Sequence, residues 1–212
     1  MNIKKAIQII NQKGILLVFP VNNNKQPNSL WSEFYPRSKM EWSWDNDGDN
    51  RVGQLWSLMK KLSDCREVVY SKWYQGRATF FSKRLFTALL RIRIDELKNP
   101  VKLSRTSLEL LEYLENDSPL STKELKKLAE LRGKDNERFY QRAIKALFKD
   151  FHIIAFGEVD DGAFPSLAIG ATKNLYEDLC SAAQVLSLDQ ARDVVNEFMP
   201  HGQLFRKYLD KI

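Results

Sequence analysis

The sequence has very little cysteine and histidine, and this scarcity excludes several classes of protein. Cys65 and Cys180 stand more than a hundred positions apart, so they cannot form a disulfide framework or a cysteine zinc cluster. The two histidines, His152 and His201, have no neighbouring serine or cysteine that would indicate a nucleophile and its base. We therefore expect a reducing, cytoplasmic compartment, unpaired thiols, and neither a metal nor a cofactor.

Long apolar runs and glycine-rich phosphate loops are also missing. The longest apolar run, residues 15–19, is far shorter than the roughly 20 residues of a membrane helix. Asn11, Gln12 and Lys13 stand where a signal peptide needs apolar residues. With 43% hydrophobic and 28% charged residues, the 212 positions predict a globular protein with a sizeable core and no membrane partner.

Positive charge and tryptophan are concentrated in the first half of the chain. The net charge is +6, which favours an acidic partner such as nucleic acid. Residues 1–100 contain 17 Lys and Arg against 9 Asp and Glu, whereas residues 101–212 contain 16 against 18, and all five tryptophans lie between positions 31 and 73. We expect a basic, Trp-rich α+β domain over 1–97, a second domain over 98–170, and C-terminal helices over 171–212 that pack across both.

Residues 98–170 have the pattern of a winged helix. A helical period over 103–116 is followed by a capping box at Ser121 and Glu124, and by a third helix from an N-cap at Asp135 to about Asp150. Alternating residues on both sides of 160–162 predict a β-hairpin between 153 and 169. The helical period of the first helix is carried by Leu108, Leu111 and Leu114, with Leu110 and Tyr113 beside them. The expected buried side of the third helix consists of Phe139, Tyr140, Ala143, Ile144, Leu147 and Phe151.

The third helix of a winged helix normally enters the major groove of DNA, and here it has a basic stripe. At about 100° per residue, four cations spaced 4, 3 and 4 apart fall within roughly 40° of one another: Arg138, Arg142, Lys145 and Lys149. The stripe could contact DNA or could be an ordinary solvated face. Glu158, Asp160 and Asp161 near the hairpin turn would be repelled by phosphate, which predicts a wing that does not touch DNA and leaves a protein-docking module as an alternative.

The first 97 residues are less regular. We expect a helix over 3–12 with a cap near Gly14, a strand over 15–19, a short helix over 29–34, a helix over 51–62, a hairpin over 67–81 and a helix opening at Ser82. The 51–62 helix is expected to place Val52, Leu55, Trp56 and Met59 on one face. This order could be a second, decorated winged helix. After residue 171, helices are expected over 175–183, 188–198 with Ser187 as N-cap, and 203–209.

Cations and aromatic residues alternate around the predicted 67–81 hairpin, at Lys72, Trp73, Arg77, Lys83 and Arg84. Such a mixture suits a single strand or an unstacked base, because rings stack on bases while cations hold phosphates. Successive side chains of a strand point to opposite faces of the sheet, so Trp73 could equally be a core residue. The acidic segment 45–50 lacks the glycine and glutamate spacing of a calcium loop, so we interpret it as a polar turn.

Several short blocks carry a resemblance to a known family. Phe19-Pro20, Ser29-Leu30-Trp31, Val69-Tyr70 and the run from Gly76 to Ser82, followed by the winged-helix pattern, resemble the AlkZ-related bacterial proteins, distant relatives of the winged-helix alkylpurine DNA glycosylases. The resemblance implies linked winged-helix units and a role in DNA repair. It does not carry catalysis across, because none of the nine glutamines is followed two places on by Gln or Asp, as the glycosylase motif requires.

The sequence thus predicts a mostly helical α+β protein that binds duplex or single-stranded DNA without acting as an enzyme. A glycosylase-like repair enzyme with other catalytic residues is the first alternative, and a protein-docking module is the second. The oligomeric state stays open.

Overall fold

The computed structural model describes residues 2–41, 50–96, 103–159 and 165–211. The protein is a mostly helical α+β structure with two small antiparallel sheets in this part of the chain. The fold class expected from the sequence is therefore confirmed. The predicted turn at 45–50 lies almost entirely outside the described residues, and the acidic pair Asp160 and Asp161 lies wholly outside them.

The first sheet is built from strands that are distant in sequence. Its order is β1 (Ile15–Leu17), β3 (Thr79–Ser82), β2 (Val68–Ser71), and all neighbours are antiparallel. The helices of this half are α1 (Ile3–Lys13), α2 (Leu30–Phe34), α3 (Arg51–Asp64) and α4 (Lys83–Glu96). Local signals set the ends, since Gly14 terminates α1 with a φ of 75° and the Ser82 hydroxyl accepts the Leu85 amide at the start of α4.

The second sheet belongs to the segment predicted as a winged helix. In chain order the elements are α5 (Arg105–Asn116), β4 (Leu120–Ser121), α6 (Thr122–Leu128), α7 (Lys134–Lys149), β5 (Ile153–Val159) and β6 (Ser166–Ala171). The three helices and the following hairpin are present as expected. Two details differ, because α7 begins after Gly133 instead of Asp135, and β4, too short to show a period of two, pairs with β6 in the order β4-β6-β5.

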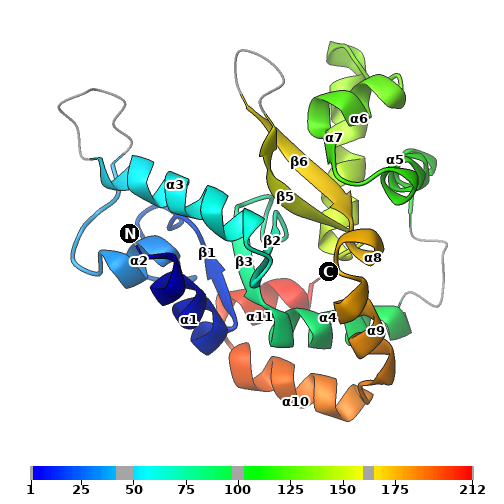
Figure 1. Ribbon diagram of the computed structural model, residues 1–212. Helices are drawn as coiled ribbons and strands as arrows, with labels where there is room; N and C mark the ends of the chain where they lie inside the picture. Colours follow the sequence, from blue (N-terminus) through cyan, green and yellow to red (C-terminus); the bar gives the residue numbers. More distant parts are fainter. Residues whose placement is uncertain (1, 42–49, 97–102, 160–164, 212) are drawn as a thin grey trace.

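The chain ends in α8 (Thr172–Leu175), α9 (Glu177–Val185), α10 (Leu188–Phe198) and α11 (Leu204–Leu209), with the expected Ser187 capping α10. Helices α9 and α10 pack along α4 below the first sheet (Figure 1). The Tyr176 hydroxyl also donates a hydrogen bond to the Val68 carbonyl of β2, at 3.1 Å. None of the helices in the described ranges combines the length and apolar character needed to cross a membrane.

The hairpin β5–β6 lies at the centre of the molecule, between α3 and β2 on one side and α5, α6 and α7 on the other (Figure 1). Both hydrophobic clusters therefore contain residues from the two halves of the chain. Leu55 and Leu147 belong to one cluster, while Phe81 and Phe151 belong to the other. The two sheets are joined through packed side chains.

Three side chains from the apolar faces predicted by the sequence are exposed, and one of them, Phe139, was expected to be buried. Leu108 is 50% exposed, Phe139 56% and Trp56 41%. The reason is geometric. Each of these helices has an apolar face wider than the part that its neighbours cover, so some apolar side chains stay in contact with solvent. Residues one or two positions away, such as Leu110, Tyr140 and Leu55, take the buried places instead.

Candidate nucleic-acid interface

The basic stripe of α7 is present on the surface. Arg138, Arg142 and Lys145 are exposed and Lys149 is half-buried, while Tyr140, Ala143 and Leu147 on the opposite face are buried. Within the described residues, none of the four cations forms an ion pair or a side-chain hydrogen bond. We call these four residues the α7 stripe, and no ion pair within the described residues neutralises its positive charge.

The basic and aromatic residues around the β2–β3 hairpin separate into different environments. Arg77 is exposed and Lys72 is half-buried. Lys83 and Arg84, predicted as DNA contacts, have partners on the C-terminal helices and stay partly exposed. Lys83 lies 4.0 Å from Asp178, and Arg84 forms a two-armed hydrogen bond with Glu197 at 2.6 and 2.7 Å.

Trp73 requires a correction, because its side chain is only 1% exposed. Its ring packs against rings from three parts of the chain, with centroid distances of 5.6 Å to Phe81, 5.8 Å to Phe151 and 4.9 Å to Tyr208. A ring enclosed in this way cannot stack on a base in this conformation. Of the two roles that the sequence allowed for Trp73, the structure supports the core residue.

A cavity of about 350 Å³ separates α7 from the turn after β2. Lys145 and Gln141 line it from α7, Lys126 from α6, and Lys72 and Gly76 from the turn. The sequence treated the stripe and the hairpin as two alternative surfaces, and the structure brings Lys145 of one and Lys72 of the other to the same cavity.

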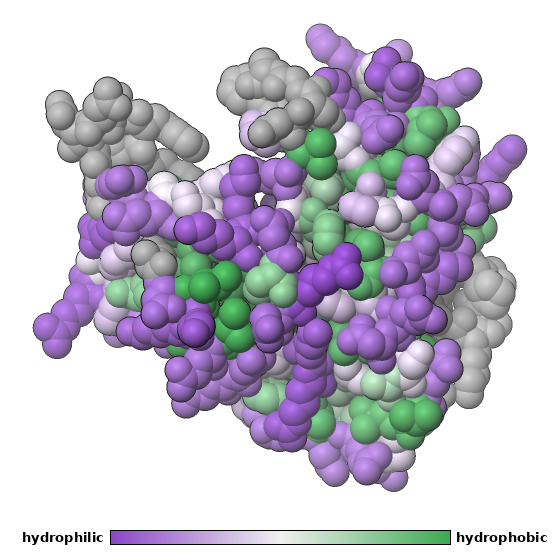
Figure 2. Space-filling model, viewed as in Figure 1, coloured by the Kyte–Doolittle hydropathy of each residue, from purple (hydrophilic) through white to green (hydrophobic). Residues whose placement is uncertain are grey.

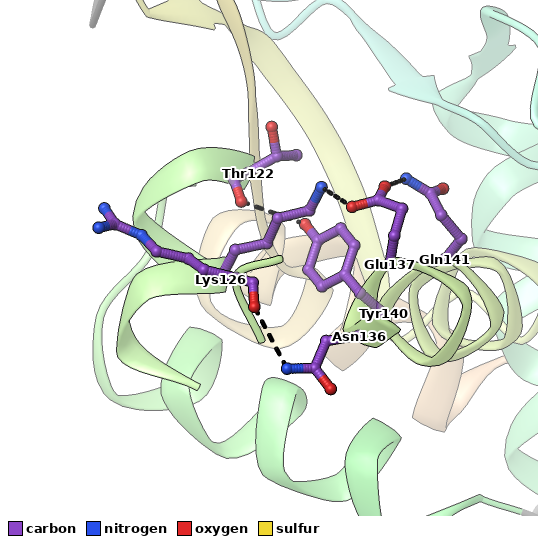
Figure 3. Close-up of polar contacts among 7 residues, drawn as sticks. Thr122, Lys126, Asn136, Glu137, Tyr140 and Gln141 are labelled. Atoms are coloured by element: carbon purple, nitrogen blue, oxygen red, sulfur yellow. Dashed lines mark hydrogen bonds and ion pairs between the residues drawn. The ribbon is translucent and has the colours of Figure 1, made fainter. Parts of the chain in front are cut away.

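Figure 3 shows how one wall of this cavity is held. Lys126 donates to the Glu137 carboxylate at 2.7 Å, and Gln141 donates to the same carboxylate at 2.7 Å. These two hydrogen bonds lower the pKa of Glu137, which keeps it charged. The Lys126 ammonium also lies 4.5 Å from the Tyr140 ring centroid, and the Tyr140 hydroxyl donates to the Thr122 carbonyl at 3.4 Å. The wall is therefore a fixed network joining α6 to α7.

A second cavity of about 350 Å³ adjoins the first and shares Lys72, Gly76 and Leu167 with it. Its other lining residues include three aromatic rings and two charged groups, namely Phe19, Trp56, Tyr70, Arg77 and Glu158. We call the two cavities together the Lys72 groove. On the face drawn in Figure 2, the surface around α6 and α7 is mostly hydrophilic with apolar residues between the charged ones.

The electrostatics of the groove centre on Lys72. Burial lowers the pKa of Lys72 below its ordinary value, and the Glu158 carboxylate opposes part of this shift. Burial also raises the pKa of the Tyr70 hydroxyl, so Tyr70 stays neutral. Glu158 itself lies 3.4 Å from the Lys60 ammonium of α3, so the one acid of the predicted wing within the described residues faces the first half of the protein.

Sequence reasoning missed three groove residues, and each was hidden for a different reason. Lys126 was treated as part of a short capped helix, Trp56 was placed on the apolar face of a helix, and Glu158 was placed at the tip of the wing. The exposed Trp56 ring stacks on Phe19 at a centroid distance of 6.5 Å. The one signal in the sequence that could have identified Trp56 as a groove residue is that it is the single aromatic residue on an otherwise aliphatic helix face.

Within the described residues, no group of three or more His, Cys, Asp and Glu side chains could hold a metal ion. His152 is half-buried, its Nε2 atom has no hydrogen-bond partner there, and burial lowers its pKa. His201 is exposed, with Nε2 3.4 Å from an Arg206 nitrogen.

Residues 1–201 of the chain match a protein family described as AlkZ related. Searches of curated proteins and of solved structures found no match.

Proposed function

Because the chain belongs to the AlkZ-related family, we propose that it is a DNA-binding protein with a role in DNA repair. Residues 98–170 are the winged-helix unit that carries the main contact through α7. Residues 1–97 supply the basic, Trp-rich unit beside it, and residues 171–212 are helices that pack across both.

The observation that carries the proposal is the absence of ion pairs along the α7 stripe in the described structure. Several other surface cations are paired, as in Lys126 with Glu137 and Lys173 with Glu115 at 2.7–2.8 Å. What sets the stripe apart is that four cations, unpaired within the described residues, share one face of α7. Like charges three or four residues apart destabilise a helix by about 0.2–0.5 kcal/mol per pair. The four cations therefore repel one another and destabilise α7 in the free protein. A polyanion such as the phosphate backbone would relieve this repulsion by neutralising them.

The Lys72 groove supports the same function from the other side. Lys145 belongs both to the α7 stripe and to the lining of the groove, and Lys72 and Arg77 stand on the facing wall. A duplex held on α7 would therefore pass next to a basic groove with aromatic walls. Aromatic and cationic side chains together suit a nucleotide outside the regular stack.

A salt titration tests the proposal. Binding of a labelled DNA duplex is measured at several salt concentrations for the protein and for the double variant Arg142→Ala/Lys145→Ala. Loss of two phosphate contacts should reduce the log–log salt slope by about 1.8, since each contact contributes about 0.9. The variant should be as stable as the parent or slightly more stable, because like-charge neighbours have been removed from α7.

The matched control is Lys4→Ala/Lys207→Ala, which removes the same charge from two exposed lysines on α1 and α11. This control should leave the slope nearly unchanged. Equal effects of the two double variants would mean that the net charge, and not α7, drives binding. A protein that binds no duplex even at low salt would contradict the proposal and favour the docking module.

A further inference from the structure

Lys72 is placed differently from the other lysines of the groove. It directly follows β2, is half-buried, and lines both cavities. Its ammonium lies 6.0 Å from the Tyr70 ring centroid and forms no ion pair or hydrogen bond within the described residues. The neighbouring lysines have taken the nearby carboxylates, Lys126 that of Glu137 and Lys60 that of Glu158.

An unpaired, partly buried lysine is costly to keep unless the amine has a use. Burial disfavours the charged form, so more of the free amine is present at neutral pH than on a surface lysine. A lysine in this state is a nucleophile toward carbonyl carbon, with which it forms a Schiff base. The groove holds this amine beside a general base candidate, Glu158, and next to cations that can hold phosphates, Arg77 and Lys145.

We propose that Lys72 forms an imine with an aldehyde carried by DNA, the ring-opened sugar of an abasic site. This inference rests on the proposed DNA binding. An abasic nucleotide suits the groove because it has no base to keep it stacked in the duplex, and its sugar can leave the helix at little cost. The exposed Trp56 ring at the edge of the second cavity can then stack on a neighbouring base.

The chemistry balances without an oxidant or a reductant. The Lys72 amine attacks C1′ of the aldehyde, and the carbonyl oxygen leaves as water, which gives a protonated imine. The imine acidifies C2′, the Glu158 carboxylate accepts the C2′ proton, and the C3′–O bond breaks with its electron pair leaving on the 5′-phosphate of the downstream fragment. Water then hydrolyses the conjugated imine, which frees Lys72 and an unsaturated aldehyde on the upstream fragment.

The positive imine has two stabilising neighbours in the groove, the Tyr70 ring and the Glu158 carboxylate. The Tyr70 ring lies beneath the Lys72 nitrogen and can interact with its charge through the π face. Tyr70 stays protonated because burial raises its pKa, so it adds no second negative charge next to Glu158. The same two groups explain why the imine should form at Lys72 in preference to an exposed lysine.

The test is reductive trapping with borohydride. The protein is mixed with a duplex containing one abasic site, the imine is reduced to a stable amine, and the cross-linked product is measured on a denaturing gel and mapped by mass spectrometry. We expect a cross-link at Lys72. Lys72→Arg keeps a cation but cannot form the imine, so the cross-link yield, measured with DNA in excess, should fall by roughly tenfold or more.

Lys72→Met is the second variant, in case arginine does not fit the groove, and Lys207→Arg is the control at a distant exposed lysine. Both Lys72 variants are first checked for an unchanged circular dichroism spectrum. An undiminished cross-link in both, or a cross-link mapped to another lysine, overturns the inference. A parallel reaction uses glyceraldehyde 3-phosphate, and modification of Lys72 by this small aldehyde without any reaction at the abasic site rejects DNA as the aldehyde source.

The two proposals fail in distinguishable ways. If the protein binds intact duplex with the expected salt slope but never cross-links to abasic DNA, only the role of Lys72 is wrong. If it binds no DNA at any salt concentration, the proposed function itself is wrong.

Discussion

Replacing Trp73 by alanine separates a core role from a ligand-binding role. The side chain is 1% exposed and packs against Phe81, Phe151 and Tyr208, so it joins the first sheet to the second half of the chain and to α11. Truncating a buried tryptophan to alanine costs about 3–5 kcal/mol. Because a domain is stable by only about 5–15 kcal/mol, this loss is a large part of the total.

The expected fall in melting temperature follows from the size of the protein. Proteins of 150–250 residues lose about 2–4 °C per kcal/mol, so Trp73→Ala should melt roughly 6–20 °C lower. Urea denaturation should show a lower midpoint with an unchanged slope. DNA binding, measured in the cold where the variant is still folded, should stay close to that of the parent.

Trp56→Ala is the matched control, since it removes the same side chain from a site that is 41% exposed. It should cost about 1 kcal/mol, mainly through loss of the stacked contact with Phe19. The reasoning would be refuted if Trp73→Ala melted like the parent and lost DNA binding. That outcome would place the Trp73 ring on the ligand.

Three further predictions concern single residues. Burial lowers the pKa of Lys72, so the unfolded chain holds this proton more tightly than the folded one, and the charged lysine destabilises the folded protein at neutral pH. Lys72→Met removes this penalty and should raise the free energy of unfolding at neutral pH. Urea denaturation should show this increase vanishing as the pH approaches 10.5, the ordinary pKa of lysine. Thiol titration should find both Cys65 and Cys180 free after denaturation, with Cys180 slow to react in the native state because burial raises its pKa. Ser187→Ala breaks the capping box with Gln190 and should cost about 0.5–2 kcal/mol in thermal denaturation.

Much of the local structure could be predicted because it depends on neighbouring residues. The bounds of α1, the hydroxyl caps at Ser121 and Ser187, and the hairpin β5–β6 all follow from residues close in sequence. Which side of a helix is buried is harder to predict. Whether Phe139 and Leu108 are buried depends on which element packs against their helices. A wide apolar face does not indicate which of its residues the neighbouring element will cover.

The candidate site could be predicted only in parts. The α7 stripe follows from helical spacing alone, and its exposure agrees with that expectation. The Lys72 groove does not follow from any local pattern, since Lys72 and Lys145 are 73 positions apart and meet only because β5 packs on α3 and β2. The sequence therefore supplied the cations and the aromatic residues, while tertiary packing decided which of them share a cavity and which, like Trp73, are enclosed.

The acids of the predicted wing argued against a wing that touches DNA, and Glu158 has a further role in the folded protein. Glu158 is repelled by phosphate only if β5 faces the DNA, yet its carboxylate lies 3.4 Å from Lys60 of α3, between the two halves of the chain. A hairpin that packs against α3 and β2 cannot also lie along a DNA backbone on that face. The hairpin thus takes part in building the groove, and in the proposed function the contact with DNA falls to α7. The negative charge of Glu158 lies next to Lys72, where the proposed imine chemistry needs a base, and it is paired with Lys60 on the side of α3, where it does not oppose the proposed binding of phosphate by the α7 stripe.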